Sequence, residues 1–239
     1  MSRSAPDSTT AVPELPRLSP GVWLLETSGR DLVSLHTLVV DHLLLEGASA
    51  RWIDARGRGR SQLLREIAPA PRVLDRIHVA RGFTAFQHAA LVASATEVVD
   101  GETGLVVAPA LDSPYRDEDV RGVDPQELLL RTLARLARIA REHEVPVLLT
   151  RTGEDRLGRT VARTAGETIA VERTRFGPRF ESDGFETLVY PTGRGDVQTT
   201  LAFWRRVLAA RQPLYAGMKG PVEGPSGPRA GEVVQGGSH

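Results

Sequence analysis

The turn after the first apolar run occupies the place of a phosphate-binding loop. Residues 21–26 are mostly apolar, the turn carries Ser28, Gly29, Arg30 and Asp31, and a long apolar helix pattern follows. A P-loop needs the pattern G-x-x-x-x-G-K-[ST], in which backbone N–H groups surround the phosphates and the hydroxyl binds Mg²⁺. Here the upstream glycine is missing, and Gly29, Arg30 and Asp31 stand in place of Gly-Lys-[ST].

Asp31 decides how this turn is interpreted. It puts a carboxylate where a P-loop has its Mg²⁺-binding hydroxyl, next to phosphate oxygens of the same sign. Two like charges about 4 Å apart repel by about 4 kcal/mol at an effective dielectric near 20. The turn therefore indicates a degenerate nucleotide-binding loop. The alternative is residual nucleotide binding without turnover, with Arg30 and the helix N-terminus holding an anion, and Asp31 argues against it.

A second group of candidates is basic and lies after Thr150. Arginines and one aromatic residue suited to nucleic-acid contact are Arg151, Arg156, Arg159, Arg163, Arg173, Arg175, Phe176 and Arg179. Arginine pairs with phosphate and bases stack on aromatic rings, which favours single-stranded DNA as the ligand. The alternative is structural, because arginines on an edge strand prevent aggregation and alternating phenylalanines belong to a core.

The residues that disulfides, metal sites and nucleophilic catalysis require are absent from the sequence or are not suitably spaced. The chain has no cysteine, so disulfides, thiolate metal sites and a cysteine nucleophile are excluded. His36 and His42 are six residues apart and do not share a helix face, and no H-x-x-x-H pattern or G-x-S-x-G turn is present. We therefore expect no metal site, no cofactor and no catalytic residues.

The elements that would position these residues alternate along the chain. Strand patterns are expected at residues 22–26, 50–54, 76–80, 103–108 and 145–150, and helix patterns at 32–45, 61–68, 85–99 and 125–144. This order predicts an α/β fold with a mostly parallel sheet flanked by helices. After Thr150 a period-two pattern with breaks at Gly177-Pro178 and Asp183-Gly184 predicts an appended antiparallel meander, and a last helix is expected at 197–210.

The ends of the chain differ in composition from the middle. Residues 1–20 are rich in Ser, Thr and Pro, and residues 212–239 are rich in Gly and Pro without apolar periodicity. We expect a disordered leader (1–20), one domain (21–211) and a disordered tail (212–239). The formal net charge is +0, so a basic surface must be local, and without a signal peptide or spanning segment we expect a cytoplasmic protein that does not bind membranes.

Three segments together resemble the core of the RecA/RadA recombinase superfamily, especially its archaeal RadA-like and KaiC-like ATPases. They are "ARWIDARGRGRSQLLREIA", "VLDRIHVARGFTAFQHAALV" and "GLVVAPALDSPYRDED" with the helix and strand that follow. The resemblance spans about residues 21–190 and implies a RecA-like fold. It also implies that the segments after the fourth and fifth strands face DNA, and that subunits assemble edge to edge.

The departures from the family pattern concern ATP chemistry. The family's catalytic glutamate is replaced by Arg56, and Ala108-Pro109 stand where the Walker B strand carries Asp-Ser, with Asp112 beyond the strand end. Phosphoryl transfer relies on lysine, Mg²⁺ and the base acting together. The resemblance with these losses implies a pseudo-ATPase.

The function expected from the sequence is therefore a non-catalytic RecA/RadA-like paralogue. It would act as an accessory or regulatory factor in DNA recombination and repair, through a recombinase-like protein partner, single-stranded DNA or both. The segment 111–124 is net acidic and would repel phosphate. The alternative is a scaffold or regulatory pseudo-ATPase unrelated to DNA, favoured if the basic residues between Arg151 and Arg179 pair with carboxylates. The oligomeric state is left open by the sequence.

Overall fold

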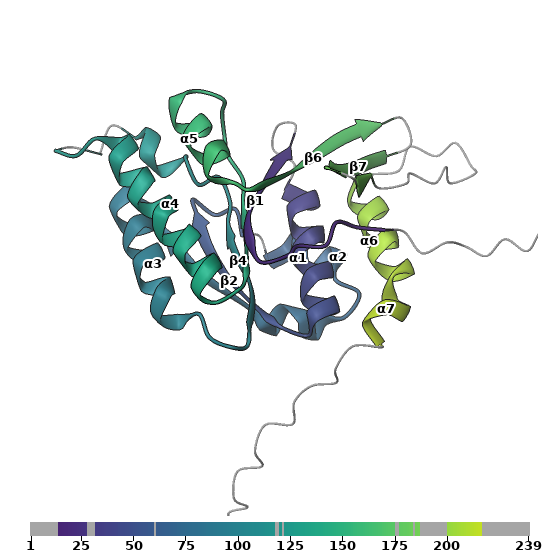
Figure 1. Cartoon of the computed structure of the whole chain (residues 1–239). Coiled ribbons are helices and arrows are strands. Elements are labelled where there is room, and N and C mark those ends of the chain that lie inside the picture. Colours follow the sequence, from purple (N-terminus) through teal and green to yellow (C-terminus); the bar gives the residue numbers. More distant parts are fainter. Residues whose placement is uncertain are drawn as a thin grey trace, which may run out of the picture.

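A twisted sheet with a helical layer on each face organises the molecule (Figure 1). The computed structural model describes residues 14–27, 32–59, 61–117, 120, 122–174, 177–183, 185–186 and 200–216. The strands are β1 (Gly21–Thr27), β2 (Ser49–Ala55), β3 (Ile77–Gly82), β4 (Thr103–Ala108), β5 (Pro146–Leu149), β6 (Glu167–Thr174), β7 (Gly177–Ser182) and β8 (Phe185–Glu186). The α-helices are α1 (Leu32–Glu46), α2 (Ser61–Ile67), α3 (Ala85–Val98), α4 (Pro125–Glu142), α5 (Arg156–Thr164), α6 (Thr200–Ala210) and α7 (Gln212–Ala216), and two 3₁₀ turns are η1 (Pro71–Arg76) and η2 (Pro114–Arg116).

The strand order is β3-β2-β4-β5-β1-β6-β7-β8. Neighbours from β3 to β6 are parallel, and β7 and β8 are added antiparallel. This confirms the predicted α/β fold with a mostly parallel sheet. One detail differs from the prediction, since β6 pairs parallel with β1 over Trp23 to Thr27 and the antiparallel part begins only at its pairing with β7.

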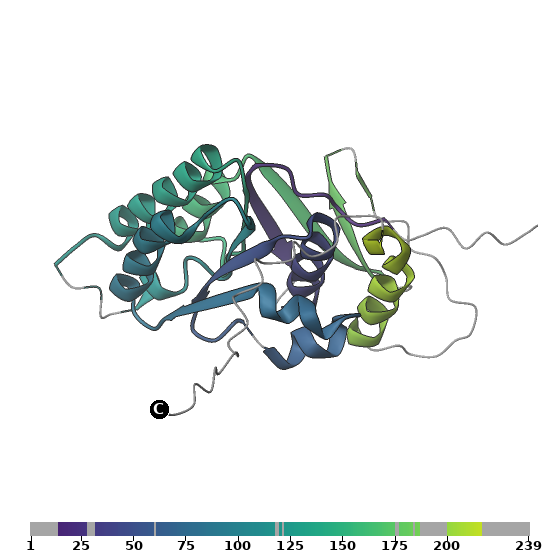
Figure 2. The ribbon, with the colours of Figure 1, turned by 90° about the horizontal axis from the view of Figure 1, so that it is seen from below.

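Two apolar cores lie on opposite faces of the sheet. On one face α1, α2, η1 and α6 pack over strand residues such as Trp52 and Leu105, and on the other α3, α4 and α5 cover Val106 and Leu149. The view from below separates the two layers (Figure 2). Because neighbouring strand residues point to opposite faces, Leu105 and Val106 enter different cores. Burial on both faces explains why these strands are continuous apolar runs.

Helix α4 illustrates how local sequence sets an element. The Asp124 side chain accepts a hydrogen bond of 2.9 Å from the Gln126 N–H, and Pro125 occupies the first turn, as expected of a capped N-terminus. The buried stripe of the helix includes Leu129, Leu133 and Leu136. The side of the helix away from the sheet carries arginines.

The C-terminal helices are held to α1 by a buried ion pair. Arg211 donates to both carboxylate oxygens of Asp41, over 2.7 and 2.9 Å, and the Tyr215 hydroxyl donates to Asp41 over 2.6 Å. Trp204 of α6 is fully buried and packs against Phe180 of β7, with ring centroids 4.9 Å apart. Helix α6 is therefore part of the folded core.

Packing begins upstream of the expected domain boundary. Leu15 and Leu18 lie in the segment expected to be a disordered leader, yet both are buried in the α1-side core. The Trp23 indole N–H also donates to the Ser19 carbonyl over 2.8 Å. At the other end, helix α7 lies within the segment expected to be a disordered tail, and its Tyr215 is bonded to Asp41. Residues 1–13 and 217–239 lie outside the described residues, so the rest of the division into leader, domain and tail stays a prediction.

Candidate functional site

The carboxyl edge of the parallel strands is where the predicted nucleotide loop would lie. Ser28, Gly29, Arg30 and Asp31 connect β1 to α1 at this edge, but they lie outside the described residues. The neighbouring strand ends are described, and each carries charged side chains. These side chains and their partners define the candidate site.

Asp54, near the end of β2, is fully buried and surrounded by donors. Its carboxylate accepts from the backbone N–H groups of Arg58 and Gly59 over 2.6 and 3.0 Å, and from Nε of Arg81 over 2.9 Å. A buried carboxylate needs such partners, since an unpaired charge in the interior is costly. These hydrogen bonds hold the turn after β2 against β3, so Asp54 stabilises the fold at this point.

Arg56, which is predicted to replace the family's catalytic glutamate, forms an ion pair with Asp117. Its backbone lies in the left-handed region, with φ of 63°. Asp117 follows η2 in the segment after β4, so the pair ties two strand ends together. One carboxylate of this segment, expected to be acidic and to repel phosphate, is therefore neutralised within the molecule.

Asp112 is the centre of a larger network. It is fully buried and accepts from Arg116 over 2.5 Å, from the Thr152 N–H over 2.8 Å and from the Thr152 hydroxyl over 3.0 Å. The same Arg116 guanidinium also pairs with Asp155, the N-cap residue of α5. Arg116 and the Gly158 N–H together lower the pKa of Asp155 to about 2. The network joins the segment after β4 to the segment after β5.

Arg151 completes the set at the end of β5. Its guanidinium lies 2.6 Å from Glu26 of β1 and 3.9 Å from Glu154. This pairing, chiefly with Glu26, raises the pKa of Arg151. Arg151 is the first of the predicted nucleic-acid residues, and its positive charge is paired with these two carboxylates.

The described strand ends leave no carboxylate of this edge without a partner. Ala108 and Pro109 end β4 without a carboxylate, and Asp112 accepts four hydrogen bonds from Arg116 and Thr152. Arg56 is bound to Asp117 and cannot act as a general base, since a guanidinium keeps its proton. Within the described part of this edge, the carboxylates of Glu26, Asp54, Asp112, Asp117 and Asp155 all have cationic partners.

Helix α5 brings three of the predicted nucleic-acid residues together. Arg156, Arg159 and Arg163 are spaced three and four apart, so they share one face of the helix, and all three are exposed. Arg159 donates to the Glu154 carbonyl over 3.1 Å. Among the described residues, no ion pair involves any of the three arginines. The helix itself contains no acidic residue.

The β6–β7 hairpin supports the nucleic-acid prediction less. Arg179 pairs with Glu172 at 2.7 Å and with Glu181 at 3.7 Å, both on the sheet surface. Arg175 and Phe176 lie outside the described residues, and the side chain of Arg173 is not described either. The described part of the prediction is therefore reduced to the face of α5.

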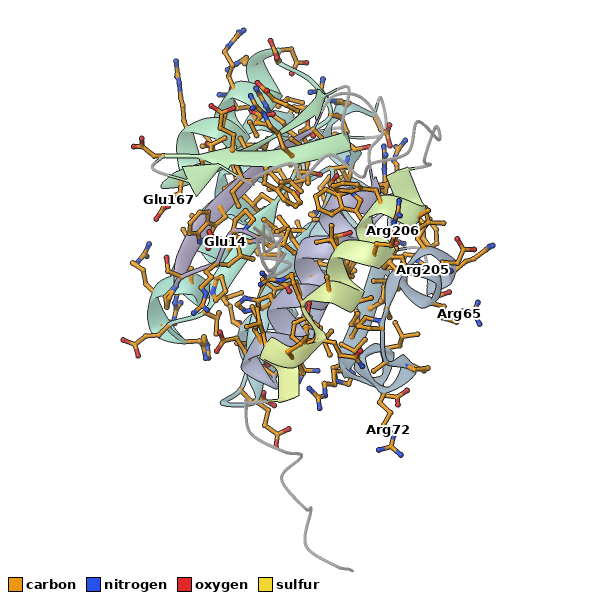
Figure 3. The ribbon with its side chains drawn as sticks, turned by 90° about the vertical axis from the view of Figure 1, so that its right-hand side faces the viewer. Glu14, Arg65, Arg72, Glu167, Arg205 and Arg206 are labelled. Carbon is orange, nitrogen blue, oxygen red and sulfur yellow. The ribbon has the colours of Figure 1, made fainter. Side chains whose placement is uncertain are left out.

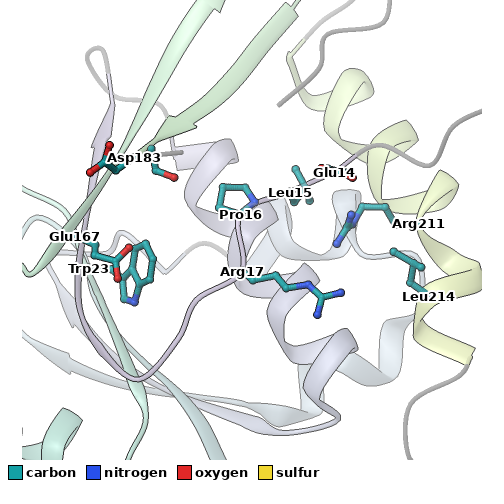
Figure 4. A pocket seen from close by; sticks show the side chains of 10 residues that line it. Glu14, Leu15, Pro16, Arg17, Trp23, Glu167, Asp183, Arg211 and Leu214 are labelled. Carbon is teal, nitrogen blue, oxygen red and sulfur yellow. The ribbon is translucent and has the colours of Figure 1, made fainter. Parts of the chain in front are cut away.

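The amino edge of the sheet carries a cavity of about 570 Å³ (Figure 4). Its lining includes Trp23, Arg17 and the carboxylates of Glu14, Glu167 and Asp183. Arg211 also borders it, but its guanidinium is bound to Asp41. Three carboxylates would repel a phosphate ligand, so this cavity is no substitute for a nucleotide site.

Strand β3 forms one edge of the sheet and is exposed along most of its length. His78, Val79, Ala80 and Arg81 are all exposed, and Phe83, just after the strand, is 64% exposed. Phe86, in the first turn of α3, is also exposed. An exposed edge strand offers N–H and C=O groups to a partner strand. This surface was not predicted from the sequence, although the apolar Phe83 and Phe86 next to a short strand are a local signal for it.

No group of three or more His, Asp or Glu side chains in the described ranges could hold a metal ion. His42 instead bonds to the Gly104 carbonyl over 2.8 Å, and His36 lies against Trp52. Among the described helices, none is long and apolar enough to cross a membrane.

Comparison with known families identifies the chain. The family model described as Rad51 matches residues 32–169, which is more than half of the 239 residues. This span runs from the start of α1 into β6 and includes the strand ends described above. No curated protein matches the chain. With its RecA-like fold, the chain belongs to the Rad51 family of recombination and repair proteins.

Proposed function

We propose that this protein is a non-catalytic member of its family, acting as an accessory or regulatory factor in DNA recombination or repair. The observation that carries the proposal is the set of ion pairs at the carboxyl edge of the sheet. There Arg56 is bound to Asp117, and Asp112 is bound to Arg116 and Thr152. In an ATP-hydrolysing relative, that edge would need a general base and a carboxylate available to Mg²⁺.

The ion pairs also hold the segments at this edge in place without a bound nucleotide. The segments after β4 and β5 are held together by Asp112, Arg116 and Asp155 without any phosphate. A protein with these segments already fixed gains no ordering from ATP. It therefore suits a role that does not depend on turnover, such as capping or stabilising an assembly of active recombinase subunits.

Two surfaces support contact with DNA or with a recombinase. The α5 face presents Arg156, Arg159 and Arg163 without ion pairs among the described residues. The β3 edge with Val79, Phe83 and Phe86 suits strand pairing with a protein partner. We assign single-stranded DNA to the first surface and a recombinase-like partner to the second.

The direct test is an activity measurement with a purified RecA-family recombinase. Phosphate release from Mg·ATP by this protein alone is expected to equal the buffer blank, with and without DNA. The strand-exchange rate of the recombinase is expected to change when this protein is added. Hydrolysis that disappears in Arg30→Ala would overturn the non-catalytic assignment, and an unchanged strand-exchange rate would overturn the accessory role.

A scaffold unrelated to DNA is the second candidate, because a specific observation favours it. Arg151 and Arg179, two of the predicted DNA residues, are paired with Glu26 and Glu172. The test is fluorescence anisotropy of labelled single-stranded DNA across a salt series. Weaker binding in Arg156→Gln with Arg163→Gln supports the DNA role, and no binding by the unchanged protein favours the scaffold.

A further inference from the structure

A second group of exposed arginines lies on the face of the molecule formed by α2, η1 and α6. Arg65 of α2, Arg72 of η1 and Arg205 and Arg206 of α6 are all exposed. Figure 3 shows the four side chains along one side of the molecule, away from the labelled Glu14 and Glu167. We call these four residues the α2–α6 arginine face.

This face is rigid because its opposite side is core. Leu64 and Ile67 of α2, Val73 of η1 and Trp204 of α6 are all buried in one apolar cluster. Helix α2 contacts both η1 and α6, so the three elements form one continuous surface. The arginines are thus held on a fixed scaffold, which is what positioning against a regular ligand requires.

The charge of this face is strongly positive within a chain of zero net charge. The three elements contain five arginines, the four above and Arg76, against two carboxylates, Glu66 and Asp75, so their net charge is +3. Glu66 accepts a hydrogen bond from Gln62 over 3.0 Å. In the described part of the chain, none of the four arginines forms an ion pair, whereas the arginines of the carboxyl edge are paired.

The chemistry of the face selects its ligand. Among the described residues, none of the exposed large apolar side chains comes from α2, η1 or α6. The face therefore lacks the apolar centre of a protein interface and the apolar anchors of a membrane-binding helix. It also lacks exposed rings for base stacking, which single-stranded nucleic acid would use. Arginines alone on a rigid surface match the regularly spaced phosphates of a duplex.

We propose that the α2–α6 arginine face binds the phosphate backbone of duplex DNA, independently of sequence. The proposal rests on the DNA part of the proposed function and deepens it, because it gives the protein separate faces for duplex and single-stranded DNA. Helix α5 lies on the other side of the sheet from α2 and α6. Duplex and single-stranded DNA would therefore not compete for one surface. An accessory factor with both could sit where a duplex meets a single strand.

The test is duplex binding by the full chain, measured by anisotropy across a salt series. Each arginine–phosphate contact contributes about 0.9 to the slope of log K against log salt, so four contacts predict a slope of about −4. The variant Arg205→Gln with Arg206→Gln is expected to lower that slope by about 2 and to weaken duplex binding roughly tenfold or more at about 50 mM salt. Its binding of single-stranded DNA is expected to stay unchanged.

Two control variants remove the same charge elsewhere. Arg131→Gln with Arg138→Gln removes two exposed arginines of α4 that already pair with Glu127 and Glu142, and duplex binding is expected to stay at the unchanged level. Arg156→Gln with Arg163→Gln tests α5. Duplex binding lost there and kept in the α6 variant would overturn this inference while the proposed function stands.

Two other outcomes would also overturn the inference. The first is that the unchanged protein binds single-stranded DNA and no duplex, which leaves only the α5 assignment. Alternatively, polyglutamate of equal charge displaces the duplex at equal concentration, which assigns the face to an acidic protein. Both results leave the recombinase assay of the proposed function to be judged on its own.

Discussion

His88 shows how one buried side chain can set the pH dependence of stability. It is fully buried on α3, and its Nδ1 lies 3.0 Å from the Tyr115 hydroxyl, which donates to Thr132. Since Thr132 in turn donates to the Leu128 carbonyl, the network assigns the ring proton to Nδ1. Nε2 is buried without a partner among the described residues, so a second proton there would find no acceptor.

The first prediction concerns acid destabilisation through His88. Burial lowers the pKa of His88 to about 4. Between about pH 6.5 and pH 4, His88 is therefore protonated in the unfolded chain but neutral in the folded chain. Stability is therefore expected to fall as pH falls through this window, by about 3 kcal/mol in total. Urea unfolding at pH 7 and pH 4.5 measures it. His88→Phe should remove most of the fall, and an equal fall in that variant contradicts the assignment.

The second prediction separates the fully buried carboxylate of the edge network from a half-buried one. Asp112→Ala leaves Arg116 with Asp155 and the Thr152 hydroxyl as partners but leaves the Thr152 N–H with none, so a loss of about 1–3 kcal/mol in unfolding free energy is expected. Asp117→Ala breaks the more exposed pair with Arg56, and a loss of about 0–1 kcal/mol is expected. Denaturant unfolding compares the two. Equal losses would mean that Asp112 does not organise the edge.

At the scale of elements, much of the fold is predictable from the sequence. The expected strands at 50–54 and 103–108 and the helix at 85–99 are confirmed within a residue at each end, because their apolar periodicity and the turns between them are local signals. The short η1 turn and α7 were missed, since five or six residues carry little periodicity. The strand expected at 76–80 is found at Ile77–Gly82, two residues later at its end.

The site was harder to predict than the elements. The Asp124 cap and the Glu127–Arg131 pair join residues two and four apart, so such contacts follow from local spacing. The pairs of Arg56 with Asp117 and of Arg116 with Asp155 could not be predicted, because the partners lie 61 and 39 residues further along the chain and only the sheet order brings them close. Pairing across strand ends depends on topology, which periodicity does not specify.

The third prediction concerns the attachment of α6 and α7. Arg211→Met leaves the buried Asp41 carboxylate with only the Tyr215 hydroxyl, so a loss of about 3–5 kcal/mol is expected. Burial and then Asp41 raise the pKa of Tyr215, so this hydroxyl stays a donor at neutral pH. Faster hydrogen exchange in α6 than in β4 would locate the effect.

A double variant provides the control for this attachment. Asp41→Leu with Arg211→Met removes both charges together, and replacing a buried ion pair by apolar residues is often neutral or stabilising. We expect it to recover at least half of the loss measured for Arg211→Met. A double variant no more stable than the single one would show that the cost arises from lost packing of the arginine stem and not from an uncompensated carboxylate.

At the scale of the whole molecule, charge is distributed unevenly although its sum is +0. The carboxyl edge of the sheet is neutralised by internal pairs such as Asp54–Arg81 and Glu26–Arg151. The amino edge carries the carboxylates of Glu14 and Glu167, and exposed arginines without an ion pair among the described residues lie on helical faces, which include those of α5 and of α2, η1 and α6. A polyanion is therefore expected to bind on the helical faces, and a small phosphate ligand has no matching site at the described sheet edge.

The fourth prediction follows from this distribution. A ligand that binds only the folded state stabilises it by about 2.7 kcal/mol at a hundred times its Kd, which raises the melting temperature by several degrees. Duplex DNA in low salt is expected to raise the melting temperature, and added salt should remove the rise because it screens the arginines. Mg·ATP at the same phosphate concentration is expected to leave the melting temperature unchanged, since Arg56 and Asp112 are already paired. A rise with Mg·ATP that is lost in Arg30→Ala would instead place a working nucleotide site at the end of β1.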